Sequence, residues 1–171
     1  MEVHLVRHTP VDCSTKVCYG RLDVPLSDSF PSDIKKIKKQ LSSSYDAVYS
    51  SPISRCVALS EALNYKEIIT DRRLLEIDFG DWEGVAWNDI NDVKLDEWMA
   101  DFVEISPPNG ESFSQMFDRV SGFIAMLRTR KFKKILIVSH SGVIRCFLAY
   151  LLKFPLKNSF RIPIGFNEHY V

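Results

Sequence analysis

The chain has 171 residues, of which 46% are hydrophobic, and its 22 Lys and Arg residues balance 22 Asp and Glu residues. This composition excludes a disordered polyelectrolyte, and without a basic stripe we expect no nucleic-acid partner. No apolar run reaches the roughly 20 residues of a membrane span, and the opening residues are too polar for a signal peptide, so we expect a cytoplasmic protein without a membrane partner.

The first half of the chain alternates short apolar runs with amphipathic stretches. A strand is predicted at 3–6. A Lys-rich surface helix follows, because Ile34, Ile37 and Leu41 recur at helical spacing. The remaining elements of this half are a strand at 46–51, a helix with Pro52 in its first turn that runs to 63, and an edge strand at 66–70.

The second half contains the longest elements. Apolar residues at helical steps predict an amphipathic helix over 112–130, and "KILIVS" at 134–139 is a clear strand. An apolar helix follows over 142–152, and the tail 161–171 adds one last strand near the sheet edge. Strands that alternate with helices predict an α/β fold, a three-layer αβα sandwich with a mostly parallel central sheet. We expect one domain over 1–171, because the length suits a single core.

Polar clusters follow three of the predicted strands. Arg7 and His8 follow the first strand, Arg55 lies shortly after the second, and His140 and Ser141 follow the strand at 134–139. Ligands bind beyond the carboxyl ends of parallel strands, and guanidinium groups match phosphate oxygens. A single histidine after a strand is usually structural. Two of them at equivalent strand ends, each with an arginine in reach, favour an anion-binding site.

An acidic segment supplies a candidate proton donor. "LLEIDFGDWEG" at 74–84 places Glu76 and Glu83 among aromatic residues, while Asp78 and Asp81 are better explained as solvated loop residues. Phosphoryl transfer from an ester needs an acid for the leaving oxygen, and Glu76 is the first choice with Glu83 in reserve. Metal binding by the histidines is the competing hypothesis. The neighbouring arginines would repel a cation, so we expect no metal and no cofactor.

The ordered motifs resemble those of the histidine phosphatase superfamily, also called the phosphoglycerate mutase-like family. They are "LVRHTPVD", "YGRLDVPLS", "YSSPISRCVALSEAL", "LLEIDFGDWEG", "PPNGES" and "ILIVSHSGVIR". The resemblance implies that His8 is the phosphorylated nucleophile, that Arg7, Arg55 and His140 hold the phosphoryl oxygens, and that Glu76 is the acid. "DFGDWEG" and the small size are most similar to the alpha-ribazole phosphatase branch, which acts in cobalamin synthesis.

The sequence departs from the family pattern at two positions near the nucleophile. Thr9 stands where the family usually has glycine, and Ser14 stands where many members carry an asparagine. Neither change removes a catalytic group. The residues expected to help bind the substrate are Ser14, Gly20, Arg21, Glu83 and Ser141.

Three functions remain open at this stage. The first is a phosphatase for small-molecule phosphate esters, with alpha-ribazole 5'-phosphate as the specific substrate or with broad specificity as the alternative. The second is a phosphoglycerate mutase-type phosphotransferase, and the third is a catalytically silent phosphate-binding protein. A helical lid insertion is expected at about 85–110, where an acidic and aromatic sequence disfavours a highly anionic substrate. Trp87 and Trp98 in it are better explained by ordinary packing of a lid helix, and the chain is expected to be a monomer or a homodimer.

Overall fold

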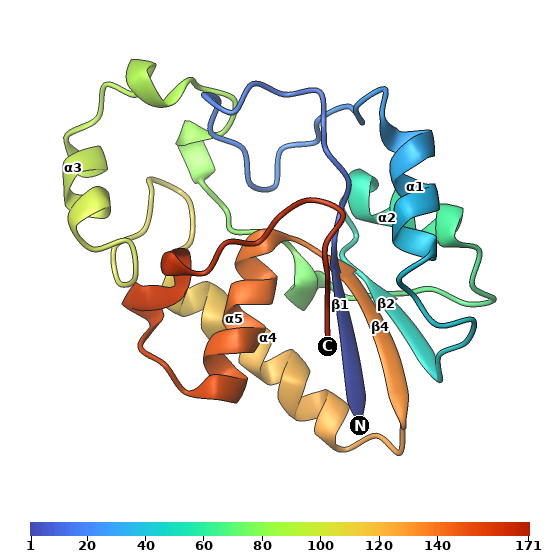
Figure 1. Ribbon diagram of the computed structural model, residues 1–171. Coiled ribbons are helices and arrows are strands. Elements are labelled where there is room, and N and C mark those ends of the chain that lie inside the picture. Colours follow the sequence, from blue (N-terminus) through green and yellow to red (C-terminus); the bar gives the residue numbers. More distant parts are fainter.

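The computed structural model describes residues 1–171 and contains one five-stranded sheet with the order β3-β2-β4-β1-β5 (Figure 1). Neighbouring strands are parallel except for β5, which pairs with β1 in the antiparallel direction. The predicted mostly parallel α/β fold is therefore confirmed. The strands are β1 Glu2–Arg7, β2 Ala47–Ser50, β3 Ile69–Thr70, β4 Lys134–Ser139 and β5 His169–Tyr170.

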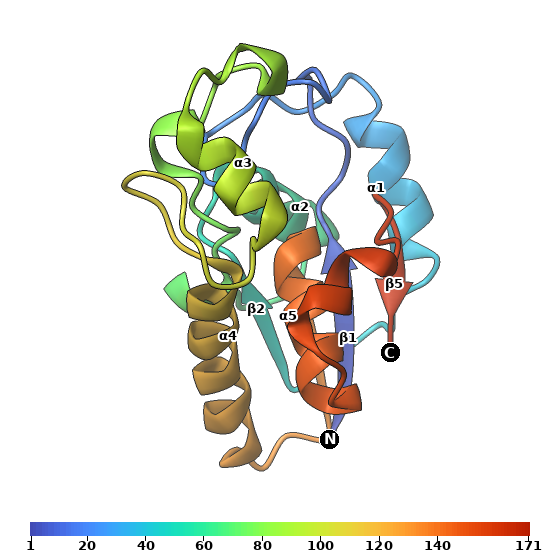
Figure 2. The same cartoon turned by 90° about the vertical axis from the view of Figure 1, so that its left-hand side faces the viewer.

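Helices cover both faces of the sheet (Figures 1 and 2). Helices α1 and α2 lie on one face, and α4 and α5 lie on the other, while α3 lies beyond the carboxyl ends of the strands. The α-helices are α1 Phe30–Lys38, α2 Ser54–Leu63, α3 Val93–Ala100, α4 Phe113–Arg128 and α5 Ser141–Leu152. Short 3-10 turns are η1 Arg72–Leu74, η2 Gly80–Trp82, η3 Trp87–Asp89 and η4 Leu156–Arg161.

The central strand β4 shows why the chain forms three layers. Successive side chains of a strand point to opposite faces, so a wholly apolar strand needs cover on both sides. Ile135 and Ile137 belong to the larger core under α4 and α5. Leu136 and Val138 belong to the smaller core under α1 and α2. Both cores consist of buried hydrophobic side chains, and their packing holds the strands whose ends carry the polar clusters.

Three predicted boundaries shift in the structure. The first helix begins at Phe30, earlier than the apolar spacing indicated, and ends at Lys38, so Leu41 packs against the core from outside it. The second helix begins at Ser54, since Ile53 is extended and its carbonyl accepts the first helical hydrogen bonds; Pro52 therefore precedes the helix. The edge strand pairs only over Ile69–Thr70.

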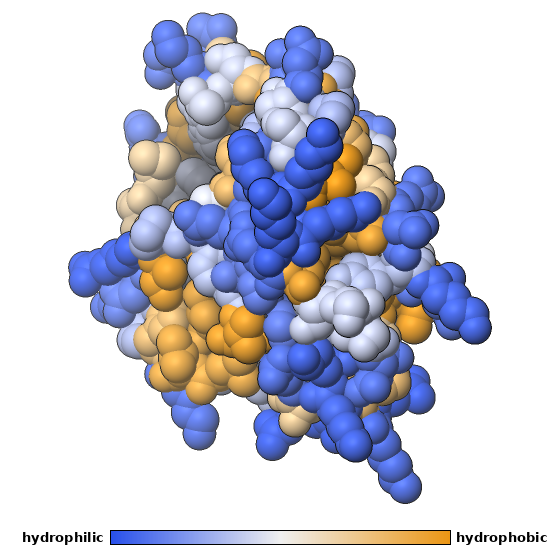
Figure 3. All heavy atoms as spheres, turned by 45° about the vertical axis from the view of Figure 1, so that its right-hand side comes forward, coloured by the Kyte–Doolittle hydropathy of each residue, from blue (hydrophilic) through white to orange (hydrophobic).

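The segment 85–110 is held by aromatic stacking. The ring of Trp98 on α3 lies 5.9 Å from that of Trp87, nearly parallel to it, and also meets the rings of Phe79 and Trp82 edge-on. Trp87 lines a cavity that Arg7 and Glu76 also line, so this cluster forms part of its wall. Figure 3 shows another face, mostly hydrophilic, with apolar atoms gathered at the lower left. None of the helices is both long enough and apolar enough to cross a membrane.

Candidate active site

Three of the predicted polar clusters meet at the carboxyl edge of the sheet. In the strand register Arg7 lies opposite Ser139, and Ser50 lies opposite Val138. The hydrogen bonds continue one residue past the strands, because the amide of His8 donates to the carbonyl of Ser139 at 3.0 Å. The backbone therefore fixes the relative positions of the first and last clusters before any side chain contributes.

The ring of His8 is almost completely buried, with 2% of the residue exposed, and its tautomer follows from its partners. Its Nδ1 lies 2.8 Å from the carbonyl oxygen of Thr9, which can only accept, so Nδ1 carries the proton. Its Nε2 lies 3.3 Å from Nε of Arg55, which can only donate, so Nε2 presents a lone pair. His8 is thus a neutral imidazole with an oriented, unprotonated Nε2.

His140 lies beside His8, with the two ring centroids 5.2 Å apart. Its Nε2 donates to the hydroxyl of Ser51 at 2.8 Å, and its Nδ1 accepts from Arg55 at 3.4 Å. Arg55 also donates to the carbonyls of Gly20 and Leu22, so this buried guanidinium joins both histidines to the loop at 20–22. The two histidines and the arginine form one connected polar cluster.

Burial and the arginines keep both histidines neutral. Burial, followed by the charge of Arg55, lowers the pKa of His8 to about 3. Burial, followed by His8 and Arg55, also lowers the pKa of His140 well below its usual value. A neutral His8 can attack phosphorus without first losing a proton. His140 was expected to hold phosphoryl oxygens, and in this structure it is a neutral ring whose N–H donates to Ser51.

Stability should therefore fall in acid. The unfolded chain binds a proton at His8 below about pH 6.5, whereas the folded protein binds it only near pH 3, so stability is lost as the pH falls. We expect His8 to remove about 2–3 kcal/mol from the free energy of unfolding between pH 7 and 4.5. Urea unfolding of the wild type and of His8→Asn at both pH values measures this difference. Equal losses in the two proteins would contradict it.

Glu76 faces the start of α5. Its Oε2 accepts from the amide of Gly142 at 3.2 Å and from the hydroxyl of Ser141 at 3.4 Å. A helix N-terminus favours a carboxylate, because its amides are unpaired and its dipole is positive. A Cβ at Gly142 would collide with the Glu76 carboxylate, so only glycine allows this approach. Glu76 and Arg7 line the same cavity.

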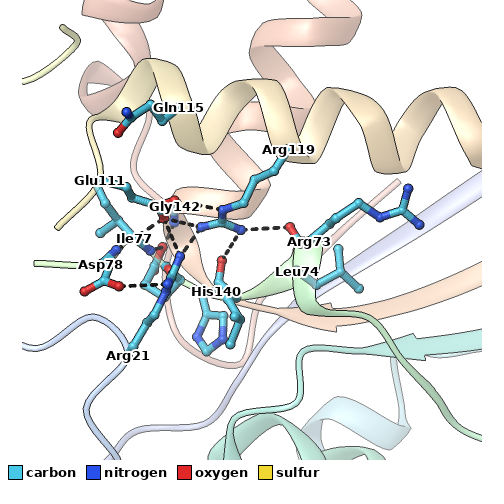
Figure 4. Close-up of polar contacts among 12 residues, drawn as sticks. Arg21, Arg73, Leu74, Ile77, Asp78, Glu111, Gln115, Arg119, His140 and Gly142 are labelled. Atoms are coloured by element: carbon cyan, nitrogen blue, oxygen red, sulfur yellow. Dashed lines mark hydrogen bonds and ion pairs between the residues drawn. The ribbon is translucent and has the colours of Figure 1, made fainter. Parts of the chain in front are cut away.

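Two arginines hold the backbone of Glu76, and Figure 4 shows these two, Arg21 and Arg119, meeting at Glu111. Its carbonyl oxygen accepts from Arg119 at 3.1 Å and from Arg21 at 3.2 Å. Both guanidinium groups pair with the carboxylate of Glu111, and Arg21 also pairs with Asp78 at 2.7 Å. Arg21, predicted to bind substrate, is thus engaged in holding Glu76 and does not line the cavity.

Loss of the Glu111 carboxylate should weaken the contacts by which Arg21 and Arg119 hold the backbone of Glu76. In Glu111→Gln the two guanidinium groups lose their shared charge partner, and we expect the free energy of unfolding to fall by about 1–3 kcal/mol. Urea denaturation measures the loss. Glu67→Gln, which changes an exposed carboxylate without a hydrogen bond in the structure, is the matched control. A Glu111→Gln loss no larger than that of the control would show that these contacts add no stability.

Of the other residues predicted to contact the substrate, most lie outside the cavity lining. The carboxylate of Glu83 accepts from the amides of Arg21, Leu22 and Phe79, which leaves it tied to backbone donors and outside the cavity lining. A Cβ at Gly20 would collide with the carbonyl of Ile77, so that position also requires glycine. Ser14 is exposed, and its hydroxyl accepts from Lys16. Ser141 is the member of this set that reaches the cavity.

Thr9 causes no backbone strain. It does not adopt a positive φ, so the position does not require the glycine that is usual in the family. Its side chain is fully buried, and its hydroxyl has no hydrogen-bond partner. The carbonyl oxygen of Thr9 accepts the hydrogen bond from Nδ1 of His8, and this contact does not involve the Thr9 side chain. The substitution is therefore compatible with the arrangement of the histidines.

Phe166 and Arg145 are among the cavity residues that were not predicted from the sequence. The cavity has a volume of about 510 Å³. Phe166, from the C-terminal tail, lies 3.6 Å from the Arg7 guanidinium and packs edge-on against His8. Arg145 lies on α5, and its spacing of four residues from Ser141 could have indicated the same helix face. No local pattern marks Phe166, because its position depends on how the tail folds back over β1.

The α/β fold thus brings a neutral histidine pair, two arginines and a carboxylate together at the carboxyl edge of a mostly parallel sheet. The family model of the histidine phosphatase superfamily (branch 1) matches residues 3–170. The chain belongs to this superfamily, whose members are phosphatases, which are hydrolases.

Several relatives carry more specific names. The chain is 30% identical over 158 residues to phosphoserine phosphatase 1 of Hydrogenobacter thermophilus, covering 86% of this chain and 74% of the relative. It is 30% identical over 178 residues to the adenosylcobalamin/alpha-ribazole phosphatase of Escherichia coli K12, covering 96% and 87%. The structure resembles that of the alpha-ribazole phosphatase from Shigella flexneri, with a TM-score of 0.91, 25% identity, and coverage of 99% and 88%.

Proposed function

We propose that the protein is a phosphomonoesterase that acts through a phosphohistidine intermediate on His8. The observation that carries this proposal is the oriented lone pair on Nε2 of His8, with Nδ1 protonated and bound to the Thr9 carbonyl. Arg55 donates both to this atom and to Nδ1 of His140, and Glu76 lies in the adjoining cavity. A nucleophile, donors for phosphoryl oxygens and an acid are the groups that the reaction needs.

The proposed reaction has two displacements. Nε2 of His8 attacks phosphorus in line while Glu76, in its protonated form, transfers a proton to the departing alkoxide. A water molecule then gives its proton to the ionised Glu76 and attacks the phosphohistidine, which releases phosphate and restores both groups. Arg7 and Arg55 stabilise charge on the equatorial oxygens, where electrostatic stabilisation supplies most of the rate.

A rapid-quench experiment tests the intermediate. With a ³²P-labelled phosphate ester we expect label on the protein that is stable in alkali and labile in acid, because a phosphoramidate hydrolyses in acid. Chelation with EDTA should leave turnover unchanged, because arginines supply the positive charge in this proposal. Acid-stable label would overturn the phosphohistidine, and loss of turnover in EDTA would overturn the metal-free chemistry.

For the substrate, alpha-ribazole 5'-phosphate is supported by relatives of that name and by the aromatic residues that line the cavity. We also propose that the segment 85–110 acts as a lid, since its Trp87 contributes to the cavity wall. A second candidate is a carboxylated ester such as phosphoserine. It is supported by relatives named phosphoserine phosphatase and by Arg145 in the same cavity.

Comparison of kcat/KM for alpha-ribazole 5'-phosphate, phosphoserine and 3-phosphoglycerate distinguishes these substrates. Release of inorganic phosphate from a preferred ester supports a phosphatase. Conversion of 3-phosphoglycerate into its isomer without phosphate release would instead show a mutase.

A further inference from the structure

Arg145 is a charged cavity residue without a partner. It lies on α5, and its guanidinium carbon is 4.8 Å from the centre of the Phe160 ring. Its side chain makes no hydrogen bond or ion pair, and its Nε is buried without an acceptor. A buried polar group without a partner costs free energy, and the cost is larger for a charged one. An acceptor that enters the cavity would remove this cost.

The other cation of the cavity already has an acceptor. Arg7 donates from Nη1 to the carbonyl of Ile164 at 2.7 Å, although its Nε also has no acceptor, and it ends β1 directly beside His8, where the proposed reaction assigns it to the phosphoryl group. Arg7 and Arg145 are the only cationic side chains that line the cavity, Glu76 is the only carboxylate, and most of the remaining lining is apolar. Arg145 is therefore the one positive group of this wall that is available to the part of a substrate remote from the phosphoryl group.

The helix sets the distance between the two ends of such a substrate. Ser141 begins α5 and contacts Glu76, and Arg145 follows four residues later on the same face. Four residues of α-helix advance by about 6 Å. An anionic group on Arg145 would thus lie a short carbon chain away from the leaving oxygen that Glu76 protonates.

We infer that Arg145 binds a carboxylate on the leaving group of the substrate, which makes a small phosphorylated hydroxy or amino acid the preferred class of ester. The inference rests on the proposed phosphatase function. A single carboxylate fits better than a second phosphate, because Arg145 is the only guanidinium of the cavity lining that makes no hydrogen bond or ion pair. Burial lowers the pKa of Arg145 and Glu76 raises it, so an added anion would favour the charged form.

Two esters that differ only in the carboxylate test this inference. Phosphoserine and phosphoethanolamine share the phosphoryl group and the ammonium group. We expect the wild type to prefer phosphoserine, and Arg145→Gln to lower kcat/KM for phosphoserine by about 10- to 100-fold, mainly through KM. Phosphoethanolamine and p-nitrophenyl phosphate should change by less than about 3-fold, and Arg145→Lys should restore part of the loss. Arg130→Gln, which removes an exposed guanidinium outside the cavity, should leave all three esters unchanged.

The outcomes separate this inference from the proposed function. An equal loss for all esters in Arg145→Gln would show that Arg145 acts through Glu76 or through the fold, and would overturn carboxylate binding. A wild type that prefers alpha-ribazole 5'-phosphate, with no dependence on Arg145, would also overturn it while leaving the phosphatase proposal intact. A wild type that hydrolyses none of these esters would overturn the proposed function itself.

Discussion

Replacement of His8 by asparagine should abolish turnover, with a loss of about 10⁴-fold or more in kcat for every ester. Asparagine keeps an N–H group that can donate to the Thr9 carbonyl, so the local backbone contact has a substitute. It lacks the nucleophilic Nε2, so no phosphoenzyme can form. Steady-state phosphate release and rapid-quench labelling measure the two effects.

The same variant should still bind inorganic phosphate, because Arg7 and Arg55 remain. Binding detected by calorimetry would show that the loss lies in the chemistry and not in the folding of the pocket. His169→Asn is the matched control, since His169 stacks on His4 between β5 and β1, away from the histidine pair. Label that persists in His8→Asn, or disappears in His169→Asn, would contradict the assignment of the nucleophile.

The strand-end clusters could be predicted because they depend on a local pattern and one general rule. An apolar run followed at once by Arg7 and His8, or by His140, is visible in the sequence, and parallel strands place such ends at a common edge. The layered fold follows from the same alternation of strands and helices. Helix ends were less predictable, as at Pro52, because the first hydrogen-bonded carbonyl depends on the turn that precedes it.

The surroundings of Glu76 depend on residues far away in the sequence. Its carbonyl oxygen accepts hydrogen bonds from Arg21 and Arg119. Both arginines are far from Glu76 in the sequence, so no local pattern predicts these contacts, and Glu76 itself lies in no helix or strand. Glu83 was the reserve candidate for the acid, and the structure gives its carboxylate three backbone donors. Long-range packing, which decides these partners, leaves no periodic signal.

The second large effect is expected for Glu76→Gln, and it should depend on the leaving group. For an alkyl phosphate the formation of the phosphoenzyme should slow by about 10²–10⁴-fold, because the poor leaving group needs a proton. For p-nitrophenyl phosphate this step should change by less than about 10-fold, since nitrophenolate leaves without one. Stopped-flow detection of the nitrophenol burst isolates the step from the later hydrolysis, which also requires Glu76 as the base.

Phosphoenzyme should therefore accumulate in Glu76→Gln with the nitrophenyl ester, whereas the alkyl ester should give little. Glu83→Gln is the matched control, since the same change occurs on a neighbouring carboxylate that binds backbone amides and lies outside the cavity lining. It should lower stability without any dependence on the leaving group. If Glu76→Gln slowed both esters equally while Glu83→Gln discriminated between them, the acid would be Glu83, and its backbone contacts would have to open during turnover.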